Sequence, residues 1–245
     1  MLFEKYMEIV EERIRRARTE QAEQIGAAAR AIADCVERGG TLFAFGCGHS
    51  ALLSQEIFYR AGGLMLVNPI FAPGTLLHER PVTITSQMER LSGLAGPVAE
   101  ASGMKAGDVL LLFSTSGRNA LPVEMGMEAQ KRGVVVIALV SKRYCAAIPS
   151  RHESGKKVPD VADIVLDNEA EAGDAVLQVE GLPAKIGPVS GAVGAAMLHG
   201  VIVEAVGLLL KRGITPPVFL SGNLPEGDEH NKRLLLEYRD QIRYM

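Results

Sequence analysis

From residue 41 onwards, short apolar runs alternate along the chain with longer stretches in which apolar residues recur at helical spacing. The runs place hydrophobic side chains at consecutive positions, so strands built from them would be apolar on both faces. Such strands joined by helices are typical of a parallel sheet in an α/β sandwich with right-handed crossovers. We predict strands at 41–45, 64–67, 108–113, 134–140 and 164–166. The helical stretches between them are expected around 51–60, 86–101 and 119–132.

The segments on either side of this pattern predict helices and loops. Residues 1–38 carry apolar side chains at three-to-four spacing, which predicts two helices, with Thr19 as the N-cap of the second and Gly39-Gly40 as its end. Two amphipathic helices ahead of a sheet must cover an apolar surface of their own domain or of a second subunit. The predicted organisation is a helical extension at 1–38, a main domain at 39–215, and a tail at 216–245 that packs on the same domain. Later features are a long basic loop at 141–160, a further strand at 175–179, an apolar helix at 189–211 and a last helix starting near Asp228.

Composition narrows the classes of partner. The 245 residues include 26 basic and 29 acidic side chains, a formal net charge of −3, so no overall basic field favours nucleic acid. The odd, widely spaced set of three cysteines suits a reducing compartment. Residues 1–18 interleave acids and bases and lack the apolar core of a secretory signal. The stretch 191–210 approaches membrane length but contains His199 and Glu204, which indicates a buried core or interface helix. We therefore expect a cytoplasmic protein that does not span a membrane.

Two small, hydroxyl-rich turns follow predicted strands. The first is Gly-Cys-Gly-His-Ser at 46–50, and the second is Ser-Thr-Ser-Gly-Arg-Asn at 114–119. Ligands of open parallel sheets bind beyond the carboxyl ends of the strands, where helix N-termini point. The second turn fits either an ordinary helix cap or a phosphate-type anion site. One cap needs one hydroxyl, so three in succession favour anion binding.

The first turn also fits a relaxed dinucleotide fingerprint, because Gly46, Gly48 and Ala51 have the spacing G-x-G-x-x-G/A. That interpretation needs an acidic residue at the end of the next strand, and the segment 66–69 reads Leu-Val-Asn-Pro. The turn is not a P-loop either, since no Gly-Lys-Ser/Thr follows. Cys47 lies near a helix N-terminus, where the pKa of a thiol falls, but no base partner for a nucleophile is identifiable.

Candidate proton-transfer residues lie near these turns. Glu56 follows Ser50 by six residues, about 9 Å along a helix. It is either one half of a surface ion pair with Arg60 or a base whose pKa is raised by its bulky neighbours. His49 could contact a phosphate or move a proton, or simply bond local backbone. His199 on the apolar helix fits a core histidine by spacing alone. The sequence holds no metal-ligand spacing, and we predict no metal and no cofactor.

These residues resemble the sugar isomerase (SIS) domain family. The resemblance rests on the glycine turn ending in Ser50, on the run Glu-Ile-Phe-Tyr-Arg-Ala-Gly-Gly at 56–63, and on Ser-Thr-Ser-Gly at 114–117. The tail segments 219–223 and 228–231 resemble a bacterial subgroup of uncharacterised SIS proteins related to phosphoheptose isomerase. The match covers most of the chain. The long basic loop at 141–160 departs from typical members and leaves the substrate undefined.

The resemblance implies a three-layer sandwich with a five-stranded parallel sheet that binds a phosphorylated sugar. Its substrate- and phosphate-binding positions correspond to Gly48, Ser50, Ser114, Thr115, Ser116, Gly117, Asn119 and Ser190. Glu56 and His199 correspond to the proton-transfer residues of phosphoheptose isomerase, with His49 as a further candidate. The expected activity is aldose–ketose isomerisation through an enediol. Alternatives are a non-catalytic phosphosugar sensor or an etherase-type lyase acting on an amino-sugar phosphate. Family sites are commonly completed across subunits, so a homodimer or homotetramer is expected.

Overall fold

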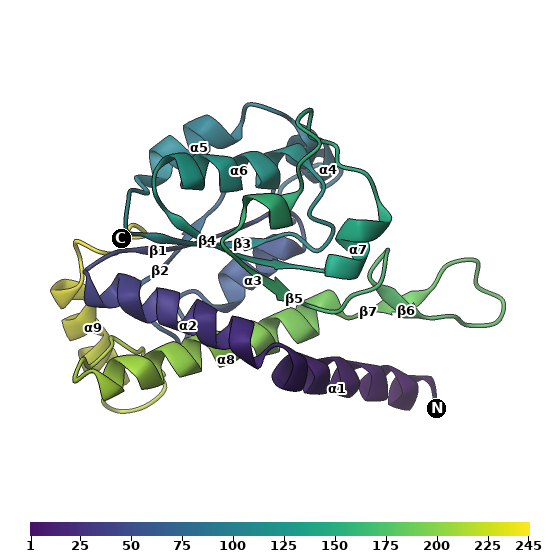
Figure 1. Cartoon of the computed structure of the whole chain (residues 1–245). Coiled ribbons are helices and arrows are strands. Elements are labelled where there is room, and N and C mark those ends of the chain that lie inside the picture. The colour runs from purple at the N-terminus through teal and green to yellow at the C-terminus, as the bar shows by residue number, and fades with distance from the viewer.

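The computed structural model describes residues 1–245 and contains one sheet of five strands (Figure 1). The strands are β1 (Leu42–Gly46), β2 (Val67–Ile70), β3 (Val109–Phe113), β4 (Val135–Val140) and β5 (Ile164–Asp167). Their order across the sheet is β2-β1-β3-β4-β5, and every neighbouring pair is parallel. The predicted α/β sandwich with a five-stranded parallel sheet is therefore confirmed.

Helices cover both faces of the sheet because its side chains are apolar on both. Leu42 and Ala44 of β1 belong to one buried cluster, and Phe43 and Phe45 belong to the other. The first cluster is completed by α1 (Leu2–Glu20), α2 (Ala22–Glu37), α3 (Ser50–Glu56) and α8 (Ser190–Lys211). The second is completed mainly by α5 (Ala95–Ser102) and α6 (Ala120–Lys131). The helical N-terminus thus packs against the sheet domain of its own chain.

The second strand begins three residues later than predicted. Residues 64–66 are apolar and buried, but they pair with the tail of the chain and not with β1. Leu64 forms an isolated antiparallel bridge with Val218, and the Met65 N–H donates to the Pro217 carbonyl at 2.9 Å. An apolar run predicts an extended segment without specifying its partner, which explains the error.

Helix ends also differ from the prediction. The stretch 86–101 is two helices, α4 (Ile84–Arg90) and α5, because Gly93 between them has φ +87° and donates its N–H to Glu124 at 2.8 Å. Helix α3 ends at Glu56, ahead of Tyr59, which has φ +45°. Thr19 is not an N-cap: it lies inside α1 and its hydroxyl donates to the Arg15 carbonyl.

The segment 141–160 is partly ordered into helix. It contains α7 (Lys142–Ala147), capped by the Ser141 side chain, and the short 3-10 helix η1 (Val158–Val161). The predicted strand at 175–179 is β6 (Ala175–Leu177), which pairs antiparallel with β7 (Ile186–Pro188). This hairpin extends away from the sheet domain beside α1 (Figure 1). The Tyr6 hydroxyl of α1 donates to the Pro188 carbonyl at 2.7 Å, which ties the two together.

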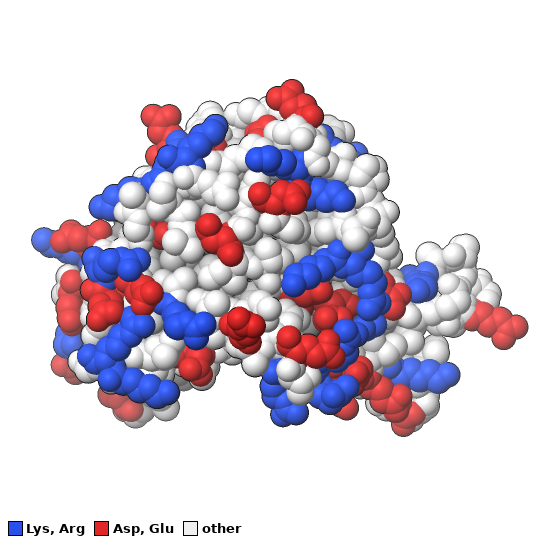
Figure 2. Space-filling model, in the orientation of Figure 1, with Lys and Arg blue, Asp and Glu red and all other residues white.

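The C-terminal part of the chain adds two helices. Helix α8 is the one helix long and apolar enough to cross a membrane, but it packs along α2 and lies against α1 and α3. Helix α9 (Gly227–Glu237) is the last helix, and its Leu234 belongs to a small buried cluster with Met65, Phe219 and Ile242. On the face shown in Figure 2, basic and acidic side chains are interspersed.

Candidate functional site

A cavity of about 910 Å³ opens at the carboxyl ends of β1 and β3. In the strand order β2-β1-β3, the chain leaves β1 for β2 on one side, and β3 lies on the other. Such a reversal is the place where open α/β sheets bind ligands. Most predicted site residues line this cavity: Gly48, His49, Ser50, Glu56, Ser114, Thr115, Ser116, Asn119 and Ser190.

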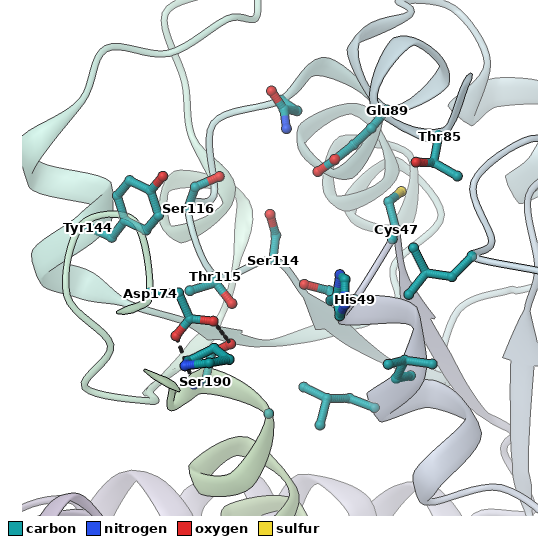
Figure 3. Close-up of a pocket in the computed structure, with 18 of the residues that line it drawn as sticks. Cys47, His49, Thr85, Glu89, Ser114, Thr115, Ser116, Tyr144, Asp174 and Ser190 are labelled. Atoms are coloured by element: carbon teal, nitrogen blue, oxygen red, sulfur yellow. Dashed lines mark hydrogen bonds between the residues drawn. The ribbon is translucent and has the colours of Figure 1, made fainter. Parts of the chain in front are cut away.

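The loop 114–119 presents several free donors to the cavity. The hydroxyls of Ser114, Thr115 and Ser116 form no hydrogen bond within the chain, and the three side chains gather at the centre of the view in Figure 3. The backbone N–H groups of Thr115, Ser116 and Asn119 likewise donate to no other group of the chain. These donors lie at the N-terminus of α6, whose dipole adds a partial positive charge. The loop can therefore hold an anion.

Gly117 shapes this loop from behind and does not line the cavity. It has φ +62°, and a Cβ there would lie 2.7 Å from the Cys145 Sγ. Its N–H donates to the Ser114 carbonyl at 3.1 Å, and its carbonyl accepts from Val158 at 2.8 Å. Only glycine combines this backbone conformation with so close an approach.

The loop 46–50 forms the neighbouring wall of the cavity. Gly48 has φ +56°, and its N–H donates to the Thr75 carbonyl at 2.8 Å. A ligand can approach the backbone of Gly48 closely, but this N–H is already used. The Ser50 hydroxyl has no partner within the chain, and His49 is exposed beside it. Cys47 is 5% exposed, and burial raises the pKa of its thiol well above the ordinary value. The expectation of a lowered thiol pKa is therefore wrong, and the protonated thiol is a poor nucleophile.

Glu56 and His199 meet at the mouth of the cavity. The Glu56 Oε1 lies 3.1 Å from the His199 Nε2, with Glu56 at the end of α3 and His199 on α8. Arg60 also bonds the Glu56 carboxylate, and its Nη1 lies 3.3 Å from the same histidine nitrogen. His199 does not itself line the cavity, but Ala195, one turn earlier on α8, does.

Of the two alternatives for Glu56, the structure contains the ion pair with Arg60, and the pKa of the carboxyl is lowered, not raised. Desolvation by its bulky neighbours would have raised that pKa. Instead, Ile57 turns into the core while the Glu56 side chain is 41% exposed. The hydrogen bond with His199 is the largest cause of the lowered pKa of Glu56; desolvation opposes it, and Arg60 lowers the pKa further. The carboxylate is thus ionised at neutral pH.

Further cavity residues come from segments in which the sequence showed no motif. They are Thr85, Ser86 and Glu89 of α4, Tyr144 of α7, and Asp174 from the turn before β6. Burial raises the pKa of Glu89, although Asn119, Arg90 and Arg151 oppose the shift. Glu89 and Asp174 lie on opposite sides of the serine loop in Figure 3. Two short helices and one irregular turn position these side chains, and the direction of such segments depends on tertiary packing, so neither spacing nor periodicity could have indicated them.

Ser190 forms two hydrogen bonds with Asp174. The Ser190 hydroxyl donates to Asp174 Oδ2 at 2.6 Å and its backbone N–H donates to Oδ1 at 2.9 Å, as the dashed lines of Figure 3 show. Both donors of Ser190 are therefore occupied by a carboxylate of the chain itself. No three His, Cys, Asp or Glu side chains are grouped so that they could hold a metal ion.

Comparison with known proteins agrees with this architecture. The family model of the SIS domain matches residues 5–141. A UPF0309 protein of Streptomyces coelicolor is 46% identical over 232 residues, which cover 94% of this chain and 92% of that protein. The chain belongs to the SIS domain family.

Two solved structures show how widely this fold extends. The phosphoheptose isomerase of Neisseria gonorrhoeae is 20% identical, with a TM-score of 0.52 over 83% of this chain and 98% of the other. The Vibrio vulnificus NanR protein, solved as a complex with ManNAc-6P, is 15% identical, with a TM-score of 0.53 over 98% of this chain and 69% of the other. At these identities the likeness concerns the SIS fold alone.

Proposed function

We propose that the cavity binds a sugar phosphate, with the phosphate group against the loop 114–119. The free hydroxyls of Ser114, Thr115 and Ser116 and the free N–H groups beside them support this placement, because a phosphate accepts many hydrogen bonds at once. The cavity wall holds no Lys or Arg side chain, so hydroxyls, amides and helix N-termini are the groups available for the anion. Ser50 and Asn119 are placed to add contacts from either side. NanR, a structural relative, binds the sugar phosphate ManNAc-6P.

We further propose that the protein is an aldose–ketose sugar-phosphate isomerase that works through an enediol. The observation that carries this proposal is the Glu56–His199 pair, which two different helices bring to the cavity mouth. Glu56 lies about 9 Å along α3 from Ser50, roughly the length of a sugar chain extending from a bound phosphate. As a base, ionised Glu56 takes the proton from the carbon next to the carbonyl and returns it to the neighbouring carbon. His199 moves the hydroxyl proton between the two oxygens.

Proton exchange with solvent tests this mechanism. Hexose and heptose phosphates are incubated with the protein in D₂O, and deuterium uptake at carbon two is followed by ¹H NMR. Glu56→Gln should lower the exchange rate by about 10²–10⁴-fold, because an amide cannot accept the proton, and should leave sugar-phosphate binding in place. Glu128→Gln is the matched control, since Glu128 pairs with Arg132 four residues later just as Glu56 pairs with Arg60. Unchanged exchange in the Glu56 variant would remove the proposed mechanism.

A non-catalytic phosphosugar sensor is the second candidate, and one observation favours it. The Glu56 carboxylate is half exposed and is hydrogen-bonded to both His199 and Arg60. Both partners lower its pKa, which weakens the carboxylate as a base. The same NMR experiment separates the two functions, because a sensor binds the ester without exchanging its proton. A thermal-shift screen of the same esters reports binding independently of turnover.

We also propose that the protein forms a homodimer or a larger homo-oligomer. Helix α1 exposes Leu2, Phe3 and Met7, and the neighbouring hairpin exposes Leu182 and Ile186. Apolar side chains gathered on two adjacent elements are typical of a subunit interface. The hairpin leads through Pro188 into the cavity wall, so a partner at this surface would lie close to the site.

A further inference from the structure

Asp174 is held in place as the cap of α8. Its Oδ1 accepts the N–H groups of Val189 at 3.1 Å and Ser190 at 2.9 Å, and its Oδ2 accepts the Ser190 hydroxyl. Asp174 itself has φ +67°, and its own N–H donates to the Glu171 carbonyl at 2.8 Å. A left-handed aspartate anchored from both sides presents a fixed negative charge at this end of the cavity.

This carboxylate occupies a position that would otherwise attract an anion. Helix α8 is 22 residues long, and its first residues, Ser190, Gly191 and Ala192, line the cavity. The free N–H groups and dipole at the start of a long helix favour negative charge. Asp174 takes up the Val189 and Ser190 donors at the start of α8, whereas the three hydroxyls of the loop 114–119 stay free.

The other charged groups of the cavity wall act in the same direction. Its carboxyls are Glu56, which pairs with Arg60, Glu89 and Asp174, and no Lys or Arg side chain lines the wall itself. Glu89 and Asp174 lie on either side of the loop 114–119 (Figure 3). A ligand with one phosphate can place it on the loop, but a second anionic group would then face a carboxylate.

We propose that Asp174 is a specificity-determining residue that restricts the cavity to sugar monophosphates with an uncharged distal end. The inference rests on the proposed binding of sugar phosphates and adds the class of ligand. The Asp174 carboxylate accepts hydrogen bonds from distal hydroxyls of the sugar, and it repels a distal phosphate or carboxylate. Like charges brought together in a binding site weaken binding strongly, which makes such a residue a selective element.

Matched pairs of esters test the selectivity. Dissociation constants are measured by calorimetry for fructose 6-phosphate against fructose 1,6-bisphosphate, and for sedoheptulose 7-phosphate against sedoheptulose 1,7-bisphosphate. Within each pair the sugar is the same and only the distal phosphate differs. The wild-type protein should bind the monophosphate of a pair about tenfold or more tightly than the bisphosphate.

Two variants assign the effect to Asp174. Asp174→Asn removes the charge but keeps an oxygen that can cap α8, since asparagine is a good cap, so the fold should be retained. It should reduce the preference for monophosphates about tenfold, bringing the two affinities close together. Glu180→Gln removes one charge from the exposed part of the same hairpin, away from the cavity, and should leave the preference unchanged.

The outcomes separate this inference from the proposed function. Equal wild-type affinities for the two members of a pair, or a preference that survives in Asp174→Asn, would overturn the role of Asp174 while leaving sugar-phosphate binding intact. A preference that falls equally in both variants would overturn it too, since net charge would then be the cause. If no ester binds the wild-type protein, the proposed function fails and this inference fails with it.

Discussion

Glu56 has two partners in the folded chain, and each of them changes its acidity. The hydrogen bond to His199 is the largest cause of its lowered pKa, and Arg60 adds to it. A carboxyl whose pKa is lower in the folded than in the unfolded chain stabilises the fold above its ordinary pKa of 4.5. That contribution to stability is lost as the pH falls below 4.5 and through the lower pKa that Glu56 has in the folded chain. The pair is therefore a source of acid sensitivity as well as a candidate proton relay.

Replacing His199 with alanine should raise the pKa of Glu56, because the strongest hydrogen bond to its carboxylate disappears. The ¹³C chemical shift of the Glu56 carboxyl, followed by NMR from neutral pH to below pH 4.5, measures it directly. An unchanged titration curve would show that the two side chains do not interact in solution.

All three cysteines are buried, which for Cys47 reverses the expected direction of the pKa shift. Burial raises the pKa of Cys35 to about 12, that of Cys145 to about 11, and that of Cys47 well above its ordinary value. Near the ordinary thiol pKa of about 8.5, all three thiols should remain protonated and shielded in the folded chain.

We predict that a thiol reagent such as Ellman's reagent labels the native protein very slowly and labels three thiols after unfolding in guanidinium. The absorbance of the released thiolate reports both stages. Rapid labelling of one native cysteine, traced to Cys47 by mass spectrometry, would contradict the buried position of that side chain.

Side chains in motifs could be placed from the sequence, and side chains outside motifs could not. Ser50, Ser114 and Ser116 follow strands directly, so the parallel sheet brings them to one edge. Glu89 and Asp174 reach the same cavity from a short helix and an irregular turn, and the direction of such segments depends on tertiary packing. The pKa of Glu56 could not be decided from spacing for the same reason, because its partner His199 is 143 residues away along the chain.

Secondary-structure elements were predicted best where one apolar run forms one buried strand. Strands β1, β3 and β4 begin within one residue of their predicted starts. The run that begins at Leu64 failed because its first residues pair with the tail near Val218 and only its end joins the sheet. Pairing partners far apart in sequence leave no local signal.

The turn between β1 and α3 depends on glycine at position 46. A Cβ on Gly46 would lie 2.6 Å from the backbone oxygen of Ser50, which cannot move without displacing the start of α3. Gly46→Ala should therefore lower the free energy of unfolding by about 2 kcal/mol. Gly207→Ala is the contrast, because a Cβ there has no neighbour within 4 Å and the position is inside α8. That change should raise stability by roughly 0.5–1 kcal/mol.

Urea denaturation of the two variants, compared through their midpoints, measures both effects. A Gly46 variant as stable as the wild type would mean that the turn between β1 and α3 has room for a Cβ at this position.

At the scale of the whole molecule, the parallel sheet was predictable, but the order of its strands and the position of α1 were not. Parallel strands and covering helices follow from the apolar runs, but the order β2-β1-β3-β4-β5, which creates the cavity, comes from the way the crossovers pack. The position of α1 beside the β6–β7 hairpin was equally hidden, since Tyr6 and Pro188 meet only in the folded chain.

We predict that the protein elutes as a dimer or a larger assembly and that two charges on α1 reduce its size. Phe3→Glu with Met7→Glu places carboxylates on side chains that are 60% and 49% exposed, so the fold of the subunit should persist while association weakens. Light scattering coupled to gel filtration measures the mass, and circular dichroism checks the fold. A wild-type monomer would contradict the proposed interface.

The central claim is that the loop 114–119 holds the phosphate of a sugar ester inside the cavity. A crystal structure of the protein with a hexose 6-phosphate tests it most directly. We expect the phosphate oxygens within about 2.7–3.2 Å of the hydroxyls and N–H groups of Ser114, Thr115 and Ser116, with the sugar carbons extending toward Glu56. An ester bound elsewhere, with this loop making no contact to phosphate, would contradict the account.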